Sequence, residues 1–254
     1  MTQPGVAVFE HLLIGYRRTW RGSVLSSFLL PVLFLVAMGF TVGGYVDRGG
    51  QLGVRYLDFI APGLLASTAL QVAVAESTWP VFSGFMWHRM YHAMRASPVR
   101  VVDMVVGHIG YVMVRVAMSA LGFLVVMTAF GAVHSPWAAT VLPVALLVGL
   151  ATAGPVFAYS ATITTDGMFP VLFRFAVVPM TLFAGVFFPV DSLPLGARAL
   201  AYVSPLWHGV ELVRAATLGT ATAWGVWAHL GYLLAWSVAG VLLAIHRFSR
   251  RLAE

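Results

Sequence analysis

Residues 181–214 read TLFAGVFFPVDSLPLGARALAYVSPLWHGVELVR, and the architecture of the chain depends on them. The stretch begins as an apolar helix, meets three breakers within a few residues, and continues as a second apolar segment that a further proline interrupts. Inside a bilayer, backbone groups freed by such breaks need partners in protein or water, so interrupted apolar helices usually line cavities. We predict a re-entrant helical hairpin over 189–215; the alternative is an apolar surface loop between two spans. Its candidate residues are Phe188, Pro189, Asp191, Pro194, Pro205, His208, Glu211 and Arg214.

Composition places the chain in a membrane. Hydrophobic residues make up 60% of its 254 residues, charged residues only 9%, and the mean hydropathy is +0.88. Soluble domains carry about 25% charged residues. The length suits about six spans of about 20 residues each with short connections. We therefore expect one all-α polytopic domain, 1–254. It would comprise an amphipathic interfacial helix at 1–22, spans at 23–43, 56–81, 101–130, 138–160, 168–188 and 223–245, and a cytoplasmic helix at 82–100.

Residue types that are absent exclude several functions. A P-loop requires a lysine on the nucleotide phosphates, and this chain has no lysine, so we expect no ATP site of its own. Cysteine is absent too, which removes disulfides and thiolate metal sites. No basic run is interleaved with stacking aromatics, so nucleic acid is not an expected partner. On the expected topology most arginines fall on one side, which predicts a plasma (inner) membrane protein with both termini cytoplasmic. No catalytic constellation is visible, and an enzyme is not expected.

The stretch 82–100, FSGFMWHRMYHAMRASPVR, is amphipathic and rich in methionine. A Met-rich face suits adaptable docking, so we predict a short cytoplasmic helix that seats in a groove of a partner protein. The alternative is an interfacial helix that only anchors the loop in lipid headgroups. His88 and His92 lack a third ligand, so no metal site is expected. The candidate coupling residues are Phe85, Met86, Trp87, Arg89, Met90, Tyr91, Met94, Arg95, Ser97 and Pro98.

Two opposite charges are expected deep in neighbouring spans. Glu76 lies in the second span and Arg115 in the third. A charge at the centre of a membrane helix costs about 2.5–3.5 kcal/mol on insertion scales, so each must face protein or water. Because the two spans are antiparallel, the two side chains can pair. We expect an intramembrane charge pair that is first a structural lock and second a substrate contact.

Several separate motifs carry a family resemblance. AGVFFPVDSLP followed by SPLWHGVELVRAATLG resembles the C-terminal signature of ABC type-2 exporter permeases. YLDFIAPGLLA and MWHRMYHAMRASPVR resemble that family's second span and coupling helix, and the likeness to nodulation lipo-oligosaccharide and daunorubicin-type drug exporter permeases covers nearly the whole chain. The resemblance implies export driven by a separate ABC ATPase subunit, in two copies, that binds ATP and Mg²⁺; no cofactor is expected on this chain. Because six spans are few to enclose a route alone, a second permease is also expected, as a homodimer or as a heterodimer with a related chain.

A path between two permeases would be lined by aromatic and methionine side chains with few charges. Such a lining favours an amphipathic, drug-like or lipid-linked substrate moved by alternating access, and leaves drug, lipid, glycolipid and oligosaccharide open. The alternative for each of these side chains is simple packing between helices or against lipid. A different class of function also stays open, a non-transporting scaffold or sensor that retains the permease fold and the ATPase partner. The candidate path residues are Phe28, Phe34, Met38, Phe40, Phe59, Phe183 and Phe187.

Overall fold

The computed structural model describes residues 4–49 and 53–253, without the side chains of residues 19, 21, 23–28, 30, 31 and 40. All regular structure in these ranges is helical. The elements are α1 (Pro4–Ala37), η1 (Met38–Val42), α2 (Gly43–Gly49), α3 (Tyr56–Ser77), α4 (Trp79–Met86), α5 (Met90–Arg95), α6 (Val101–Ala129), η2 (Pro136–Thr140), α7 (Val141–Ser160), η3 (Asp166–Met168), α8 (Phe169–Leu172), η4 (Phe173–Val177), α9 (Val178–Phe183), η5 (Val190–Ser192), α10 (Leu195–Val203), α11 (Pro205–Leu218) and α12 (Val226–Ala253).

Five helical stretches of the described chain are long and apolar enough to cross a membrane. The all-helical membrane class is therefore confirmed. The expected first span, 23–43, is not among them, and it contains most of the residues whose side chains are not described. That span and the interfacial helix at 1–22 stay predictions. Helix α1 runs without a break from Pro4 to Ala37, and η1 follows it to Val42. The five stretches are Tyr56–Met86, Val101–Ala129, Pro136–Ser160, Asp166–Phe183 and Val226–Ala253.

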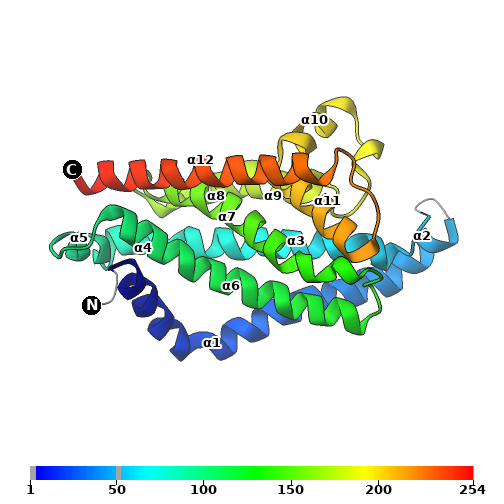
Figure 1. Ribbon diagram of the computed structural model, residues 1–254, viewed down its shortest axis with the longest axis horizontal. Coiled ribbons are helices and arrows are strands. Elements are labelled where there is room, and N and C mark those ends of the chain that lie inside the picture. Colours follow the sequence, from blue (N-terminus) through cyan, green and yellow to red (C-terminus); the bar gives the residue numbers. More distant parts are fainter. Residues whose placement is uncertain (1–3, 50–52, 254) are drawn as a thin grey trace.

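The helices form an elongated bundle (Figure 1). The stretch that holds α3 is the most buried, at 78%, and the stretch that holds α7 follows at 67%. Around these two pack α6, α11 and α12, and α1 packs along α6. The start of α1, the end of α12 and α5 lie at one end, called here the α5 end, whereas α2, α10 and α11 lie at the other, the far end (Figure 1).

The second expected span is broken before it ends. Thr78 has φ −95° and ψ −98°, and α4 begins directly afterwards with Pro80 in its first turn. Proline has no backbone N–H to continue the preceding helix but is tolerated where a new one starts. The Ser160 hydroxyl donates to the Ser77 carbonyl at this break over 2.7 Å. Because α4 follows the break, helical structure reaches Met86, beyond residue 81, where the second span was predicted to end.

The fifth expected span, 168–188, consists of short pieces. A five-residue π-helix, η4, separates α8 from α9, and α9 ends at Phe183. Gly185 follows with φ +75°, a conformation that glycine adopts at little cost. The helix therefore stops earlier than the sequence pattern predicted, and the residues up to η5 form an irregular connection.

Two glycines let α7 and α12 touch backbone to backbone. A Cβ atom added to Gly154 would lie 2.6 Å from the carbonyl carbon of Gly240. A Cβ on Gly240 would lie 2.5 Å from Cδ of Pro155 and 3.0 Å from its backbone nitrogen. Small residues at membrane helix contacts permit such close approach.

Gly240→Ala is therefore expected to destabilise the protein. The added methyl meets backbone and a proline ring that cannot rotate away, and overpacking of this kind costs about 1–3 kcal/mol. Gly231→Ala on the same helix is the control, because its Cβ would meet nothing within 4 Å. That change should be neutral or stabilising by up to about 1 kcal/mol through helix propensity. Thermal unfolding of both variants in detergent measures the difference, and equal transitions would contradict the close contact.

Candidate functional site

A tight turn at Arg89 leads from α4 into the short helix α5. Arg89, just before it, has a left-handed conformation with φ +47°, which reverses the chain after α4. Met86 is 42% exposed and Trp87 is 60% exposed. Arg89 and Arg95 are exposed as well. The turn and α5 thus present apolar and basic side chains to whatever lies outside the bundle at this end.

Two residues expected on that surface point inward instead. Phe85 is 2% exposed and Tyr91 is 0% exposed. The sequence was interpreted as one continuous helix over 82–100, and the turn at Arg89 changes which residues share a face. Met90 and Met94 are half-buried and also pack against the hydrophobic core. The exposed candidates form the outer surface of the loop, called here the docking surface after its predicted role: Met86, Trp87, Arg89, Arg95, Ser97 and Pro98.

Tyr91 fastens α5 to three other helices. Its hydroxyl lies 2.6 Å from Nδ1 of His108 on α6. Its ring packs against Phe85 of α4 with centroids 4.6 Å apart and against Phe248 of α12 at 5.1 Å. Burial raises the pKa of Tyr91, so the hydroxyl stays protonated and able to donate. A displacement of α5 must therefore move these helices or break this contact.

Two further residues complete that contact, and sequence reasoning missed both. Gly84 leaves room for the tyrosine, because a Cβ there would lie 2.6 Å from the Tyr91 ring. Arg251 lies over the Phe85 ring at 4.5 Å and donates to the carbonyls of Ser160, Ala161 and Ile163 at 2.9–3.1 Å. These carbonyls lie at the end of α7 and just beyond it, where a helix C-terminus favours a cation. The sequence offered one indication of the Arg251 contact, namely an arginine close to the end of a long apolar helix.

The two intramembrane charges meet. Nη2 of Arg115 on α6 lies 3.1 Å from Oε1 of Glu76 on α3, and the side chains are 11% and 17% exposed. The Arg115 guanidinium also lies 4.2 Å from the centroid of the Tyr16 ring on α1. The cluster therefore joins three helices at one place in the bundle, and it sets α1 against this pair, a contact that the sequence analysis did not predict.

The candidate path residues divide into three groups. The side chains of Phe28 and Phe40 lie outside the described part of the chain. Phe59 is buried beneath Arg214, whose guanidinium lies 4.1 Å from the ring centroid. The half-buried members are Phe34, Met38, Phe183 and Phe187, and the rings of Phe34 and Phe187 lie 5.8 Å apart. The structure thus brings α1 to the irregular connection after α9.

Arg214 of α11 holds the irregular connection 184–194, called here the interrupted segment, to the bundle. It donates to the Gly185 carbonyl over 2.8 Å and to the Phe59 carbonyl over 3.2 Å, and it pairs with Glu211 at 3.3 Å. Gly185 follows the end of α9, so the arginine partners a backbone group that the break in the helix sets free. Its side chain is 14% exposed.

The other residues of the predicted hairpin lie in two settings. Pro189, Asp191 and Pro194 are exposed around η5, and Phe188 is half-buried. Pro205 and His208 are buried in α11. His208 Nδ1 lies 2.9 Å from Nδ1 of His229 on α12, and its Nε2 lies 3.1 Å from the Tyr202 carbonyl. Thus α10 and α11 form two short helices at the far end, and α11 is fastened to α3 and α12.

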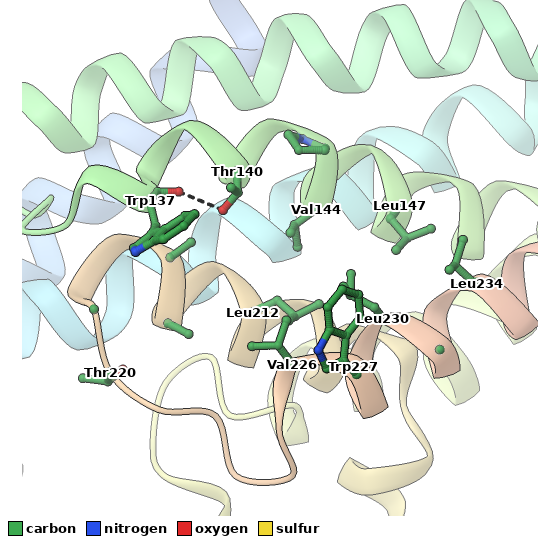
Figure 2. A pocket seen from close by; sticks show the side chains of 15 residues that line it. Trp137, Thr140, Val144, Leu147, Leu212, Thr220, Val226, Trp227, Leu230 and Leu234 are labelled. Carbon is green, nitrogen blue, oxygen red and sulfur yellow. Dashed lines mark hydrogen bonds between the residues drawn. The ribbon is translucent and has the colours of Figure 1, made fainter.

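A groove of about 900 Å³ opens at the far end between α7, α11 and α12. Figure 2 shows Trp137 and Thr140 at one part of it and Leu147 and Leu234 at another, with Leu212 from α11 between the two longer helices. The lining contains no charged side chain. Sequence reasoning did not predict this groove. In the described residues no group of three or more His, Cys, Asp or Glu could hold a metal ion.

Comparison with known proteins adds the family. The profile described as ABC-2 type transporter matches residues 6–218. The chain belongs to this family. It is 28% identical to Nodulation protein J of Rhizobium leguminosarum bv. viciae, over 97% of this chain and 94% of that protein. It is 29% identical to Nodulation protein J of Rhizobium leguminosarum bv. trifolii, over 97% and 93%. It is 25% identical to the inner membrane transport permease YadH of Escherichia coli, over 88% and 89%.

Membership of the ABC-2 family makes this chain a multi-pass transmembrane subunit of a transport system, the component without a nucleotide-binding domain. The resemblance inferred from the motifs is thereby confirmed. The docking surface, the charge pair and the Arg214 contacts all lie within the residues that match the family.

Proposed function

We propose that this chain is the permease subunit of an ATP-driven exporter that works as a pair, with two ABC ATPase subunits bound at the α5 end. The observation that carries the proposal is the contrast within the loop after α4. Its outer residues are exposed, whereas Tyr91 is wholly buried against α4, α6 and α12. An exposed surface on a fixed internal anchor is what a partner needs in order to move membrane helices.

The energy source lies on the partner. The sequence has no lysine, so it has no P-loop, and ATP with Mg²⁺ would bind to the ATPase subunit. The docking surface offers methionine, tryptophan and arginine side chains, which suit an adaptable groove with acidic groups at its rim. Both termini and this surface would be cytoplasmic, in agreement with the arginines of α12 at the α5 end. The plasma (inner) membrane is the expected location.

A second permease would cover the least packed helix. Only 11% of the apolar window within Asp166–Phe183 is buried, against 78% for Tyr56–Met86. Phe175 is 79% exposed in the same stretch. Two-fold pairing through this face would place Phe34 and Phe187 beside the partner, with a path between the two chains. A homodimer and a heterodimer with a related permease would both use this face.

The substrate class follows from the residues near that path. Phe34, Met38, Phe183 and Phe187 give it an apolar, aromatic character with few charges. Such a lining favours an amphipathic molecule, drug-like or lipid-linked, over a free ion. The direction of transport would be outward, as the resemblance to exporter permeases implies.

Capture of an ATPase by the docking surface tests the proposal. A photo-reactive residue in place of Trp87 is expected to cross-link a co-expressed ABC ATPase. The same residue in place of Trp137 should not, although Trp137 is similarly exposed, at 68% against 60%, because it lies at the far end. Mass spectrometry of the cross-linked band identifies the partner. No ATPase from position 87, or equal capture from both positions, would contradict the assignment.

A non-transporting scaffold or sensor that keeps the ATPase partner is the competing function. The purified complex in phospholipid vesicles distinguishes the two. An exporter is expected to hydrolyse ATP faster when an amphipathic drug or glycolipid from a test panel is added, and to accumulate it across the membrane. A scaffold would bind the ATPase and show neither response.

A further inference from the structure

The groove at the far end owes its shape to where α7 and α12 touch. The two helices meet at Gly154 and Gly240, on the α5 side of the groove. Towards the far end α11 lies between them and contributes Leu212, Ala215 and Ala216 as a floor. The result is a wedge whose lining ends at Leu147 and Leu234, before the contact of Gly154 with Gly240, and which is open at its side and far end. Figure 2 shows Leu147 and Leu234 at that inner end.

The chemistry of the lining selects an uncharged, apolar occupant. Leucine, valine, alanine and proline make up most of it, and its polar side chains are two threonines and two tryptophans. Thr140 already donates to the Trp137 carbonyl over 2.8 Å. A volume of about 900 Å³ lies within the range of small-molecule pockets, which is about 300–1,000 Å³. A charged ligand would find no side chain of opposite charge in it.

The depth of the groove matches one leaflet. It runs along α12 from Val226 to Leu234, a rise of about 12 Å at about 1.5 Å per residue. The hydrocarbon core of a bilayer is about 30 Å thick, so the groove ends near its midplane. Trp137 and Trp227 lie near the far-end starts of α7 and α12, where tryptophan commonly sits at headgroup level.

We infer that this groove is a binding site for one acyl chain of a membrane phospholipid from the far-end leaflet. A helix of a second copy would cross both leaflets, whereas the groove closes where Gly154 meets Gly240. The face left open along a whole span belongs to α8 and α9 instead. The groove is continuous with the lipid-facing side of α12, where Val238 and Leu242 are exposed. A phospholipid therefore reaches it without crossing protein.

The bound chain supports α11. Leu212 forms part of the floor, and Glu211 and Arg214 on the same helix hold the interrupted segment. An acyl chain that fills the wedge gives α11 packing partners on a side where α7 and α12 do not reach. The inference needs only a bilayer around the chain and does not rest on ATP-driven export.

A filled groove tests the inference. Gly231 lies in the lining, and a Cβ there would meet nothing within 4 Å, so Gly231→Phe should occupy the space without disturbing the backbone. Gly196→Phe on α10 is the matched control, because its Cβ also meets nothing within 4 Å and the residue is outside the groove. After delipidating detergent washes, native mass spectrometry should find phospholipid retained by the wild type and by Gly196→Phe, and lost from Gly231→Phe.

Fluorescence locates the lipid. The chain is placed in phosphatidylcholine vesicles containing a minor fraction of phosphatidylcholine brominated in the upper part of one acyl chain. The emission of Trp137 and Trp227, isolated by subtracting that of the Trp137→Phe/Trp227→Phe variant, should be quenched more than the brominated fraction predicts. In Gly231→Phe this excess should disappear. Equal lipid retention by both glycine variants, quenching no greater than the brominated fraction, or loss of self-association in Gly231→Phe by light scattering would overturn the inference.

Discussion

Replacing Arg115 with alanine is expected to destabilise the folded chain by about 3–5 kcal/mol, because the change leaves the Glu76 carboxyl without its cation in a bundle where it is 17% exposed. The arginine also packs over the Tyr16 ring, so α1 loses a contact with α6. The expected result is a lower thermal transition in detergent and less monodisperse protein on size exclusion. A variant with the same transition as the wild type would remove the structural role of the pair, and normal export by the same variant would remove the substrate role as well.

The double variant Glu76→Leu/Arg115→Leu separates those two roles. Removing both charges and keeping apolar volume often restores or raises stability. We expect the thermal transition of this variant to recover most of the loss. If transport recovers with it, the pair is a lock; if the stable variant fails to transport a substrate of the wild-type complex, the charges contact that substrate. Glu76→Leu alone should behave like Arg115→Ala, since it leaves a buried guanidinium unpaired.

The sequence predicted the Glu76–Arg115 pair because a lone charge in a membrane helix has a high free energy, and because two antiparallel spans can bring the two charges together. Two opposite charges in antiparallel apolar helices cannot both face lipid, and only their depth had to be estimated. Tyr91 shows the opposite case. Its buried position depends on the left-handed turn at Arg89, which no periodicity reveals, and on a histidine on α6 with which it shares a hydrogen bond. The burial of Tyr91 thus depends on contacts between segments distant in the sequence. The interpretation of 82–100 as one continuous helix therefore placed Tyr91 on the exposed face.

The boundaries of the interrupted span were harder to predict than its existence. Pro189 and Pro194 indicated a break, but α9 already ends at Phe183 and Gly185 makes the turn. The groove behind α11 lay beyond sequence reasoning for a similar reason. It exists because Gly154 and Gly240 bring two helices together on one side of it, and such pairing is a property of the packed bundle.

Arg214→Ala is expected to release the interrupted segment. The change removes donors from the Gly185 and Phe59 carbonyls and leaves Glu211, 19% exposed, without its cation. Breaking one partner of a buried ion pair costs about 3–5 kcal/mol. We expect a large fall in the thermal transition together with faster proteolysis in the connection 184–194, since the carbonyl that fastens it to α11 is then unpaired.

Two controls distinguish this fastening from a general charge effect. Arg198→Ala deletes an arginine that donates to the Asp191 and Leu193 carbonyls within the same segment, and its loss should cost only about 0.5–1.5 kcal/mol because it joins no distant helix. In Arg214 one terminal nitrogen, Nη2, donates to both carbonyls while the other, Nη1, pairs with Glu211. Arg214→Lys keeps the charge but has a single nitrogen for all three partners, so an intermediate transition is expected. If Arg214→Ala were no worse than Arg198→Ala, the segment would be held by packing of Leu206 and Trp207, both buried, and the arginine would serve only to neutralise Glu211.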